Sequence, residues 1–299
     1  MTTYHSPFRE DTLEGKRILI TGGGSGLGAE MALHLAEHGA EVHLWGRRES
    51  ALAETQERIH ATAPDRVHYQ TVNIREADSV DSAMEHLWND HGPLTGLINN
   101  TAANFIAPAE SISPDGYEAI ASTVMDGSYF TTHAADRRWI ASGLPGTVLS
   151  TLASWVWTGS AYVVPSAMSK AAVDAMTKSL SVQWAKHNIR LNAVAPGPFP
   201  TDFTWQVLGA DSPADALSSE AGMPMGRPGK MSELTNLVLF LISDAADYLT
   251  GQTISIDGAQ MYAEPATFAS LTAMSEDDWA QAQAAAKKAT APSKAERRA

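Results

Sequence analysis

The feature that most constrains this chain is a glycine-rich turn near the N-terminus, which joins a short apolar run to a helical pattern. Residues Arg17–Thr21 form the β-rich run, and Gly22-Gly23-Gly24-Ser25-Gly26-Leu27-Gly28 follows it directly. Glycine lets the backbone turn sharply and lets other groups approach closely. The helix beyond such a turn offers free N–H groups and the positive end of its dipole to an anion.

The position of this turn predicts its ligand. A glycine pattern between a strand and a helix, with a second strand after the helix, is the context of a dinucleotide-binding motif. A turn without any ligand is the alternative. We expect a bound pyrophosphate to contact the turn, through Gly22, Gly24, Ser25, Gly26, Leu27 and Gly28.

Strand patterns alternate with helical patterns along the chain. The expected strands are Arg17–Thr21, Glu41–Trp45, Val67–Asn73, Gly96–Asn100, Thr147–Thr151, Arg190–Ala195 and Thr253–Ile256. The expected helices are about Gly26–His38, Glu49–Ala61, Ala77–His91, Tyr117–Ala141, Ser166–His187 and Ser232–Ser243. Most strands are apolar throughout, as strands covered on both faces should be. The pattern predicts an α/β fold of Rossmann type: a doubly wound, seven-stranded parallel sheet in a single domain, with helices on both faces.

Composition limits the partners. The 299 residues contain 44% hydrophobic residues, no cysteine and a formal net charge of −13. An acidic surface disfavours nucleic acids and anionic membranes, and no apolar run is long enough to span a membrane. The histidines are scattered without metal-ligand spacing, so no metal is expected. The N-terminal residues do not read as a signal peptide, which favours a cytoplasmic protein.

The end of the second strand indicates which dinucleotide binds. A site for NAD carries Asp or Glu there, to bind the ribose 2′-hydroxyl. This chain has Trp45-Gly46-Arg47-Arg48 instead. Guanidinium groups pair with phosphate in a bidentate fork, so Arg47 and Arg48 favour the 2′-phosphate of NADPH over NADH. The alternative is that both arginines only begin a solvated helix.

Two segments interrupt the alternation. Residues 197–230 are rich in Pro, Gly, Ser and Asp, which is typical of a lid or substrate loop, or of a flexible surface loop. We expect residues 12–262 to form the dinucleotide-binding domain and residues 263–299 a C-terminal extension. Ser275–Ala285 is expected to be helical with Ser275 as its cap, and the last dozen residues to be disordered.

The spacing Thr21-Gly-x-x-x-Gly26-x-Gly28 resembles the short-chain dehydrogenase/reductase family. Asn99-Asn100-Thr101-Ala102, Asn192-x-x-x-Pro196-Gly197 and Asp257-Gly258 resemble further motifs of that family. The resemblance implies more cofactor-binding positions besides Lys170. These are Asn73, Ile74, Asn100, Thr101, Ala102, Pro196, Gly197, Phe199 and Thr201.

A narrower resemblance points to the 2,4-dienoyl-CoA reductases of this family. It rests on Asn99 to Phe105, on Val163-Val164-Pro165-Ser166-Ala167-x-x-Lys170 and on Pro196-Gly197-Pro198. The stretch Ser275 to Trp279 is also similar to the end of those enzymes. The resemblance implies a homotetramer that uses NADPH to reduce a conjugated dienoyl thioester, hence an acyl-CoA-like substrate.

The expected catalytic residues depart from the common pattern of the family. Most members carry Tyr-x-x-x-Lys with a Ser about thirteen residues upstream. Here Ser166 precedes Lys170, and the upstream position is near Ala153, with Ser154 adjacent. A serine hydroxyl is a poor acid near neutral pH, so the usual carbonyl-reducing machinery is incomplete. The dienoyl-CoA reductases share Ser-x-x-x-Lys, because a dienolate needs hydrogen-bond donors more than a proton donor on oxygen. A surface lysine is the alternative for Lys170.

Two further positions differ from the mitochondrial type of dienoyl-CoA reductase. Its Tyr and Asn donors correspond to Trp155 and Asp126 here. An indole N–H can donate but cannot act as an acid, and Trp155 alternatively only packs. Asp126 must be protonated or position a water to assist. Alternatively it caps a helix or pairs with Arg137 or Arg138.

Tyr162 is a further catalytic candidate, four residues before Ser166. Helical spacing would place it on the face of Lys170, but Pro165 marks the first helical turn, so this spacing does not hold before it. We therefore expect Tyr162 to line the substrate pocket. Asn104, Phe105, Trp157 and Phe203 are the expected substrate residues, and aromatic residues such as Phe199 and Trp205 line either an acyl pocket or the core.

The sequence thus favours an NADPH-dependent oxidoreductase that reduces a C=C bond of a 2,4-dienoyl-CoA or a related unsaturated thioester. Two alternatives stay open. One is a carbonyl or alcohol oxidoreductase with an atypical proton donor, and the other is an NADP-binding scaffold that has lost its catalytic chemistry.

Overall fold

A single seven-stranded sheet organises the computed structural model, which describes residues 6–201, 223–263 and 269–285. All strand pairs are parallel, and their order is β3-β2-β1-β4-β5-β6-β7. The strands are β1 (Arg17–Thr21), β2 (Glu41–Gly46), β3 (Val67–Thr71), β4 (Gly96–Asn99), β5 (Gly146–Thr151), β6 (Ile189–Pro196) and β7 (Thr253–Ile256). The expected doubly wound parallel sheet is therefore confirmed. Its strand order reverses between β1 and β4, where such sheets bind their ligands.

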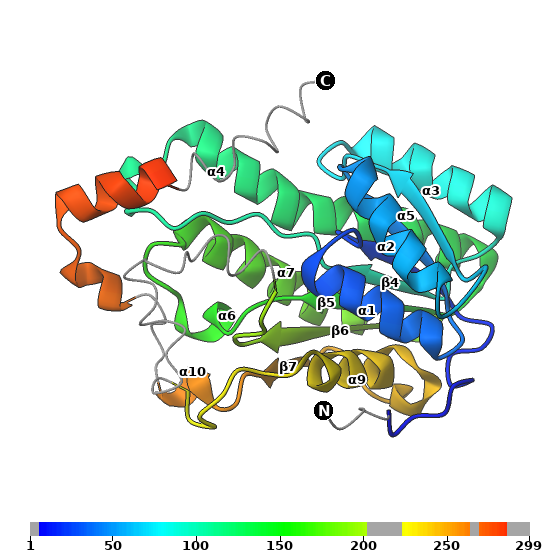
Figure 1. Ribbon diagram of the computed structural model, residues 1–299. Coiled ribbons are helices and arrows are strands. Elements are labelled where there is room, and N and C mark those ends of the chain that lie inside the picture. Colours follow the sequence, from blue (N-terminus) through cyan, green and yellow to red (C-terminus); the bar gives the residue numbers. More distant parts are fainter. Residues whose placement is uncertain (1–5, 202–222, 264–268, 286–299) are drawn as a thin grey trace.

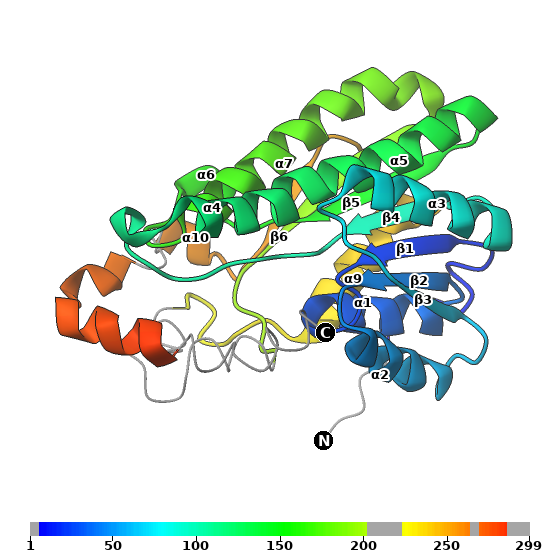
Figure 2. The same cartoon turned by 90° about the horizontal axis from the view of Figure 1, so that it is seen from above.

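Helices cover both faces of the sheet (Figures 1 and 2). On one face lie α1 (Gly26–Glu37), α2 (Glu49–His60) and α9 (Met231–Ile242). On the other lie α3 (Ala77–His91), α4 (Pro114–Ala121), α5 (Gly127–Ser142) and α7 (Val164–Trp184). Short helices at α6 (Trp155–Thr158) and α10 (Gln260–Ala263) complete the described helices that Figure 1 labels.

Two apolar clusters, one on each face, hold the layers together. In β1, Ile18 and Ile20 are buried against α1 and α9, whereas Leu19 between them is buried in the cluster that contains Met84 of α3 and Trp139 of α5. Alternate residues of a strand point to opposite faces, so a strand that is covered twice must be apolar throughout. This requirement explains why the strands could be recognised from their composition.

The helical region expected over Tyr117–Ala141 differs from the prediction in its start and in its continuity. It begins earlier, because the Ser113 side chain caps it through the Gly116 N–H (3.1 Å) and Pro114 occupies its first turn. It is also interrupted by a wider π-helical turn at Ser122–Asp126. There the Ser122 and Thr123 hydroxyls donate to backbone carbonyls four residues earlier, and such back-bonding bends helices. Wide turns of this kind are frequent at functional sites.

Smaller differences concern the ends of elements. The third strand ends at Thr71 rather than Asn73, and α7 begins at Val164 rather than Ser166. The tail is helical over residues 276–285, and the Ser275 hydroxyl accepts the Asp278 N–H at 3.2 Å, so the expected cap is present. The end of the chain, expected to be disordered, lies outside the described residues.

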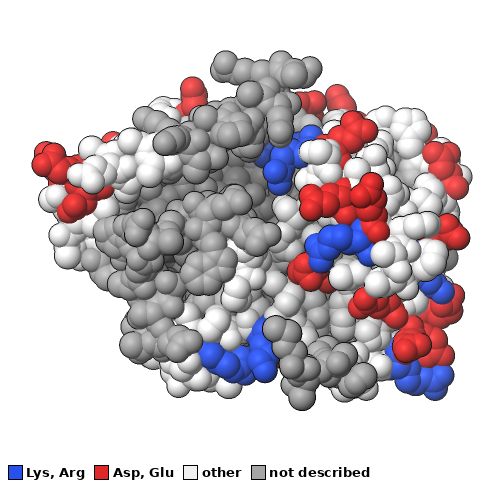
Figure 3. All heavy atoms as spheres, viewed as in Figure 1, with Lys and Arg blue, Asp and Glu red and all other residues white. Residues whose placement is uncertain are grey.

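The described surface agrees with the acidic composition. Figure 3 shows acidic side chains gathered over the part of the molecule that carries α2 and α3 in Figure 1, with basic side chains in small separate groups. A broad basic surface, which a nucleic acid requires, is absent from the described part of this face. Among the described helices, none combines the length and apolar character needed to cross a bilayer.

Candidate active site

The glycine turn follows the C-terminal end of β1 and leads into α1. Gly22 (φ +67°) and Gly26 (φ +55°) have left-handed backbone conformations, which favour glycine. A Cβ on Gly28 would lie 2.2 Å from the Gly22 carbonyl oxygen and 2.5 Å from Asn100 Nδ2. Gly28 therefore has no room for a side chain, and the first turn of α1 packs directly on the glycine turn. Ser25, the exposed N-cap of α1, makes no side-chain capping bond.

The end of β4 is joined to this turn. The Thr21 hydroxyl accepts the backbone N–H groups of Asn100 (3.1 Å) and Thr101 (3.2 Å). The Asn100 side-chain amide donates to the Thr21 carbonyl at 3.3 Å. These bonds place Asn100, Thr101 and Ala102 at the reversal of strand order, beside the glycine turn. The expected pyrophosphate site and the expected Asn-Thr-Ala segment are therefore adjacent.

Arg47 and Arg48 follow β2, and both are exposed. Arg48 is the N-cap residue of α2. Asn73 and Ile74 follow β3, where Ile74 is buried and lies so close to Gly127 that a Cβ there would be 2.7 Å from Ile74 Cδ1. These positions lie at the carboxyl ends of β2 and β3, the two strands on one side of β1.

The end of β6 contributes a second group of expected cofactor residues. Pro196 ends β6, and a Cβ on Gly197 would lie 2.7 Å from the Cβ of Asp257. Thr201 reaches over the glycine turn, because a Cβ on Gly26 would be 3.9 Å from its Cγ2. The Phe199 side chain is only 6% exposed and belongs to the main core, which is one of the two places expected for it.

Lys170 and Ser166 are buried on one face of α7, one helical turn apart. The Lys170 ammonium donates to the backbone carbonyl of Thr151, the last residue of β5. Burial lowers the pKa of Lys170 to about 8. Lys170 is therefore not a surface lysine. Sequence reasoning missed Thr151, whose hydroxyl is also buried and unbonded among the described residues. Its position at the carboxyl end of a central strand was the available signal.

Asp126 closes the wide turn, which packs against α7. Its side chain does not cap α5. Arg137 and Arg138 both bind Asp81 instead, at 2.5 and 2.8 Å. Neither structural alternative for Asp126 is therefore present, and the half-buried carboxyl group lies in a segment next to the helix that carries Ser166 and Lys170.

Tyr162 and Trp155 lie in a small apolar cluster outside the main core. Tyr162 has a left-handed backbone (φ 63°), its carbonyl accepts the Ala107 N–H at 2.9 Å, and α7 begins only two residues later. Its ring contacts Trp279 from the C-terminal segment, with a centroid separation of 4.9 Å. The half-buried Trp155 begins α6, which packs against α7. The C-terminal residues, orange to red in Figure 1, thus contribute to this cluster.

The expected substrate residues are less closely grouped. Asn104 holds a buried side-chain oxygen with no partner among the described residues. Phe105 lies against the first turn of α4, since a Cβ on Gly116 would be 3.2 Å from its ring. Trp157 is 43% exposed and lines a surface hollow with Tyr262. Phe203 lies outside the described residues, as does most of the expected loop over residues 197–230.

Comparison with known proteins agrees with this geometry. A family model described as enoyl-(acyl carrier protein) reductase matches residues 22–259. A Bacillus subtilis protein named "Probable 2,4-dienoyl-CoA reductase [(2E)-enoyl-CoA-producing]" is 38% identical over 83% of this chain and 97% of its own length. The chain belongs to the short-chain dehydrogenase/reductase family. It is therefore an oxidoreductase by family.

Similarity to solved structures agrees with this family assignment. A short-chain dehydrogenase from Bacillus anthracis matches with a TM-score of 0.77 and 34% identity, over 83% of this chain and 97% of the other. A gluconate 5-dehydrogenase from Burkholderia cenocepacia, solved with NADP and tartrate, matches with a TM-score of 0.76 and 30% identity, over 85% and 98%. These similarities support a nicotinamide cofactor.

Proposed function

We propose that this chain is an NADPH-dependent reductase of a 2,4-dienoyl-CoA or a related unsaturated acyl thioester. One observation carries the proposal: Ser166, not a tyrosine, is buried one helical turn before the buried Lys170. The usual phenol donor of carbonyl reduction is thus missing at this position. Tyr162, the nearest phenol in the sequence, precedes the helix, and its ring lies against Trp279.

The residues at the carboxyl edge of the sheet fit a nicotinamide dinucleotide. Gly28 and Gly22 keep the turn free of side chains, so that a pyrophosphate can approach the N-terminus of α1. The buried Lys170 amine is suited to hold the nicotinamide ribose, and the exposed Arg47 and Arg48 to hold a 2′-phosphate. When bound, the reduced nicotinamide supplies a hydride. The preference for NADPH over NADH is part of the proposal.

The proposed chemistry places charge on the thioester oxygen. Addition of hydride to the carbon of the diene farthest from the thioester shifts electrons through the conjugated system and leaves a dienolate. Protonation of a carbon by water then yields the enoyl thioester, so that one hydride and one proton are added. The protein has to stabilise the oxyanion with hydrogen-bond donors. We assign this role to the Trp155 indole N–H and the Ser166 hydroxyl, with Asp126 either protonated or holding a water.

A steady-state assay tests the proposal. The full-length protein is mixed with a 2,4-dienoyl-CoA and either NADPH or NADH, and cofactor oxidation is followed. We expect turnover with NADPH and formation of an enoyl-CoA product. Tight NADPH binding without turnover of this substrate or of other unsaturated thioesters would contradict the proposal. That result would favour the alternative of an NADP-binding scaffold without catalytic activity.

The similarity to a gluconate 5-dehydrogenase favours one second candidate, a carbonyl or alcohol oxidoreductase with an atypical proton donor. Tyr162 or Asp126 would then have to supply the proton. This candidate predicts turnover of ketones that is lost in Tyr162→Phe or Asp126→Asn. The dienoyl reductase predicts that Asp126→Asn keeps most of its activity, because an amide N–H can donate to an oxyanion.

We also propose that the chain forms a homotetramer through the faces of α5 and α7. These helices lie side by side (Figure 2), and they expose large side chains, among them Tyr129 (50% exposed), Met168 (54%) and Val182 (81%). Large exposed apolar side chains are typical of interaction surfaces when they form a patch. Light scattering after size exclusion should give four chains, and Val182→Glu should lower that number. A monomer at all concentrations would contradict the proposal.

A further inference from the structure

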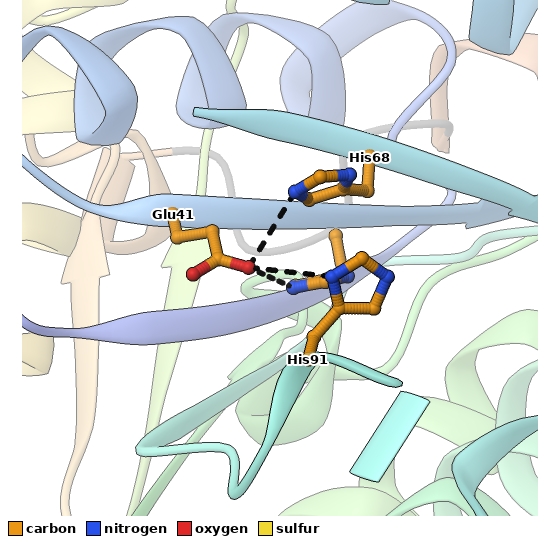
Figure 4. A group of neighbouring side chains, drawn as sticks. Glu41, His68 and His91 are labelled. Atoms are coloured by element: carbon orange, nitrogen blue, oxygen red, sulfur yellow. Dashed lines mark hydrogen bonds and ion pairs between the residues drawn. The ribbon is translucent and has the colours of Figure 1, made fainter. Parts of the chain in front are cut away.

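A cluster of three histidines and one glutamate lies at the amino edge of the sheet, the edge opposite the glycine turn. Glu41 and His43 belong to β2, His68 to β3 and His91 to the end of α3. Figure 4 shows the rings of His68 and His91 directed toward the Glu41 carboxylate. The histidines are scattered along the chain, and their spacing predicts no metal. The fold nevertheless brings one ligand atom from each of the four residues within 4.8 Å of the others.

The sheet explains how the cluster forms. Glu41 and His43 are two residues apart on β2 and so point to the same face. The register pairs His43 with His68 on the neighbouring strand. Helix α3 packs on that face, and its last residue, His91, brings a third imidazole to the group. The ring centroids of His68 and His91 are 4.2 Å apart, and those of His43 and His68 are 5.0 Å apart.

The distances match a small tetrahedral site. Glu41 Oε1 is 3.0 Å from His43 Nε2, 3.5 Å from His68 Nε2 and 3.7 Å from His91 Nδ1. A tetrahedral ion bound at about 2.0–2.1 Å separates its ligand atoms by about 3.3 Å. Small ring rotations therefore suffice to direct all three nitrogen lone pairs at a common centre.

The chemical state of the cluster also suits a cation. Burial lowers the pKa of His43 to about 3, and it lowers the pKa of His68 as well. Imidazole binds metals in its neutral form. Burial disfavours the Glu41 carboxylate, but Arg17 and His43 together outweigh this effect and lower the pKa of Glu41. Arg17 binds Glu41 Oε2 at 3.0 Å, which leaves Oε1 for the histidines. Its positive charge also limits the affinity for a dication.

We propose that Glu41, His43, His68 and His91 bind a first-row divalent transition metal, of which Zn²⁺ is the probe of choice. Imidazole with one carboxylate is a ligand set for such ions, whereas Mg²⁺ and Ca²⁺ require oxygen ligands. The side chains of His68 (39% exposed) and His91 (33%) leave a path from solvent. Four protein ligands fill the coordination of the ion, so the site is structural and ties β2, β3 and α3 together.

Metal binding to the untagged full-length protein tests the proposal. The protein is treated with a chelator and titrated with Zn²⁺ by calorimetry, and the bound zinc is then counted by mass spectrometry. We expect one zinc per chain, a raised Tm and no competition from excess Mg²⁺. The zinc X-ray absorption spectrum should show a four-coordinate, nitrogen-rich shell.

Matched variants assign the binding to the cluster. His68→Ala and His91→Ala should each weaken Zn²⁺ binding at least 10-fold, and the double variant should abolish it. His86→Ala is the control, because His86 is an exposed histidine on the same helix as His91. Circular dichroism without metal verifies that all variants fold. Less than one zinc per chain, or equal binding by His86→Ala and the double variant, would overturn the proposal.

Discussion

The two edges of the sheet differ in how they assemble their candidate binding residues. At the carboxyl edge, the glycine turn occupies seven consecutive residues, Gly22 to Gly28, and Lys170 and Ser166 are four residues apart on one helix. At the amino edge, Glu41, His68 and His91 come from three elements that are far apart in the sequence. The groups at the carboxyl edge come from residues that are close in the sequence. The groups at the amino edge are brought together by strand register and helix packing.

This difference determines which substitutions each site tolerates. A local motif depends on the backbone of one turn, so a single added methyl group can damage it. A cluster assembled by register depends on the sheet as a whole and is damaged mainly by removal of its own side chains. The predictions below use this contrast, beginning with the largest expected effect.

Gly28→Ala should have the largest effect. The new Cβ would lie 2.2 Å from the Gly22 carbonyl oxygen, which is backbone and cannot move aside. We expect a loss of stability of about 3 kcal/mol, and a loss of NADPH affinity of about 100-fold where the variant still folds. Chemical unfolding and fluorescence titration measure both. Gly116→Ala is the control, because the nearest atoms to its Cβ would be side-chain atoms, the end of the Phe105 ring at 3.2 Å and Ser113 Oγ at 3.3 Å, and not backbone. Equal behaviour of the two variants would contradict the close packing.

Trp155→Phe should slow the chemical step and leave NADPH affinity unchanged. Loss of one donor to an oxyanion costs about 3 kcal/mol, or a factor of about 100 in rate. Single-turnover kinetics with a dienoyl-CoA measures this step directly. Unchanged turnover would leave Trp155 with a packing role only.

Lys170→Met should raise stability while it lowers turnover. The unfolded chain keeps the Lys170 proton up to about pH 10.5, whereas the folded chain releases it near pH 8. Wild-type stability therefore rises with pH between these values, and the whole cost of burying the charge is present below pH 8. That cost is about 3 kcal/mol.

Urea unfolding tests this linkage. The free energy of unfolding of Lys170→Met should exceed that of the wild type most at pH 7, and this difference should shrink toward pH 10. Lys178→Met is the matched control on the same helix, because the Lys178 side chain is 53% exposed and pairs with Asp174. It should change stability little at either pH. An advantage of Lys170→Met that is independent of pH would show that burial of the charge is not its cause.

The smallest effect should be the coupling between the two edges. Saturating Zn²⁺ should change NADPH affinity by less than about twofold, because sites without shared partners are close to independent. Calorimetric titration with NADPH, with and without zinc, measures this. A larger change would show that the metal acts on the cofactor site. The two edges of the sheet would then not be independent.

Much of the carboxyl edge was predictable from sequence. The glycine turn, Lys170 and Ser166 follow local spacing rules, and the comparisons confirmed the family. Other features depended on packing. Asp126 lies in a wide turn that the apolar period of Tyr117–Ala141 did not reveal, because that turn results from hydroxyl back-bonding at Ser122 and Thr123. Phe199 was expected either in an acyl pocket or in the core, and packing places it in the core.

The sequence by itself determined the parallel sheet, the position of the dinucleotide turn and the departure from the common catalytic tyrosine. Each of these depends on residues that are neighbours along the chain, where periodicity and the freedom of glycine act directly. Only the tertiary structure decided that His43 pairs with His68, that His91 joins them from α3, and that Trp279 contacts Tyr162. Strand register and helix packing bring these residues together, and no short spacing in the sequence records either.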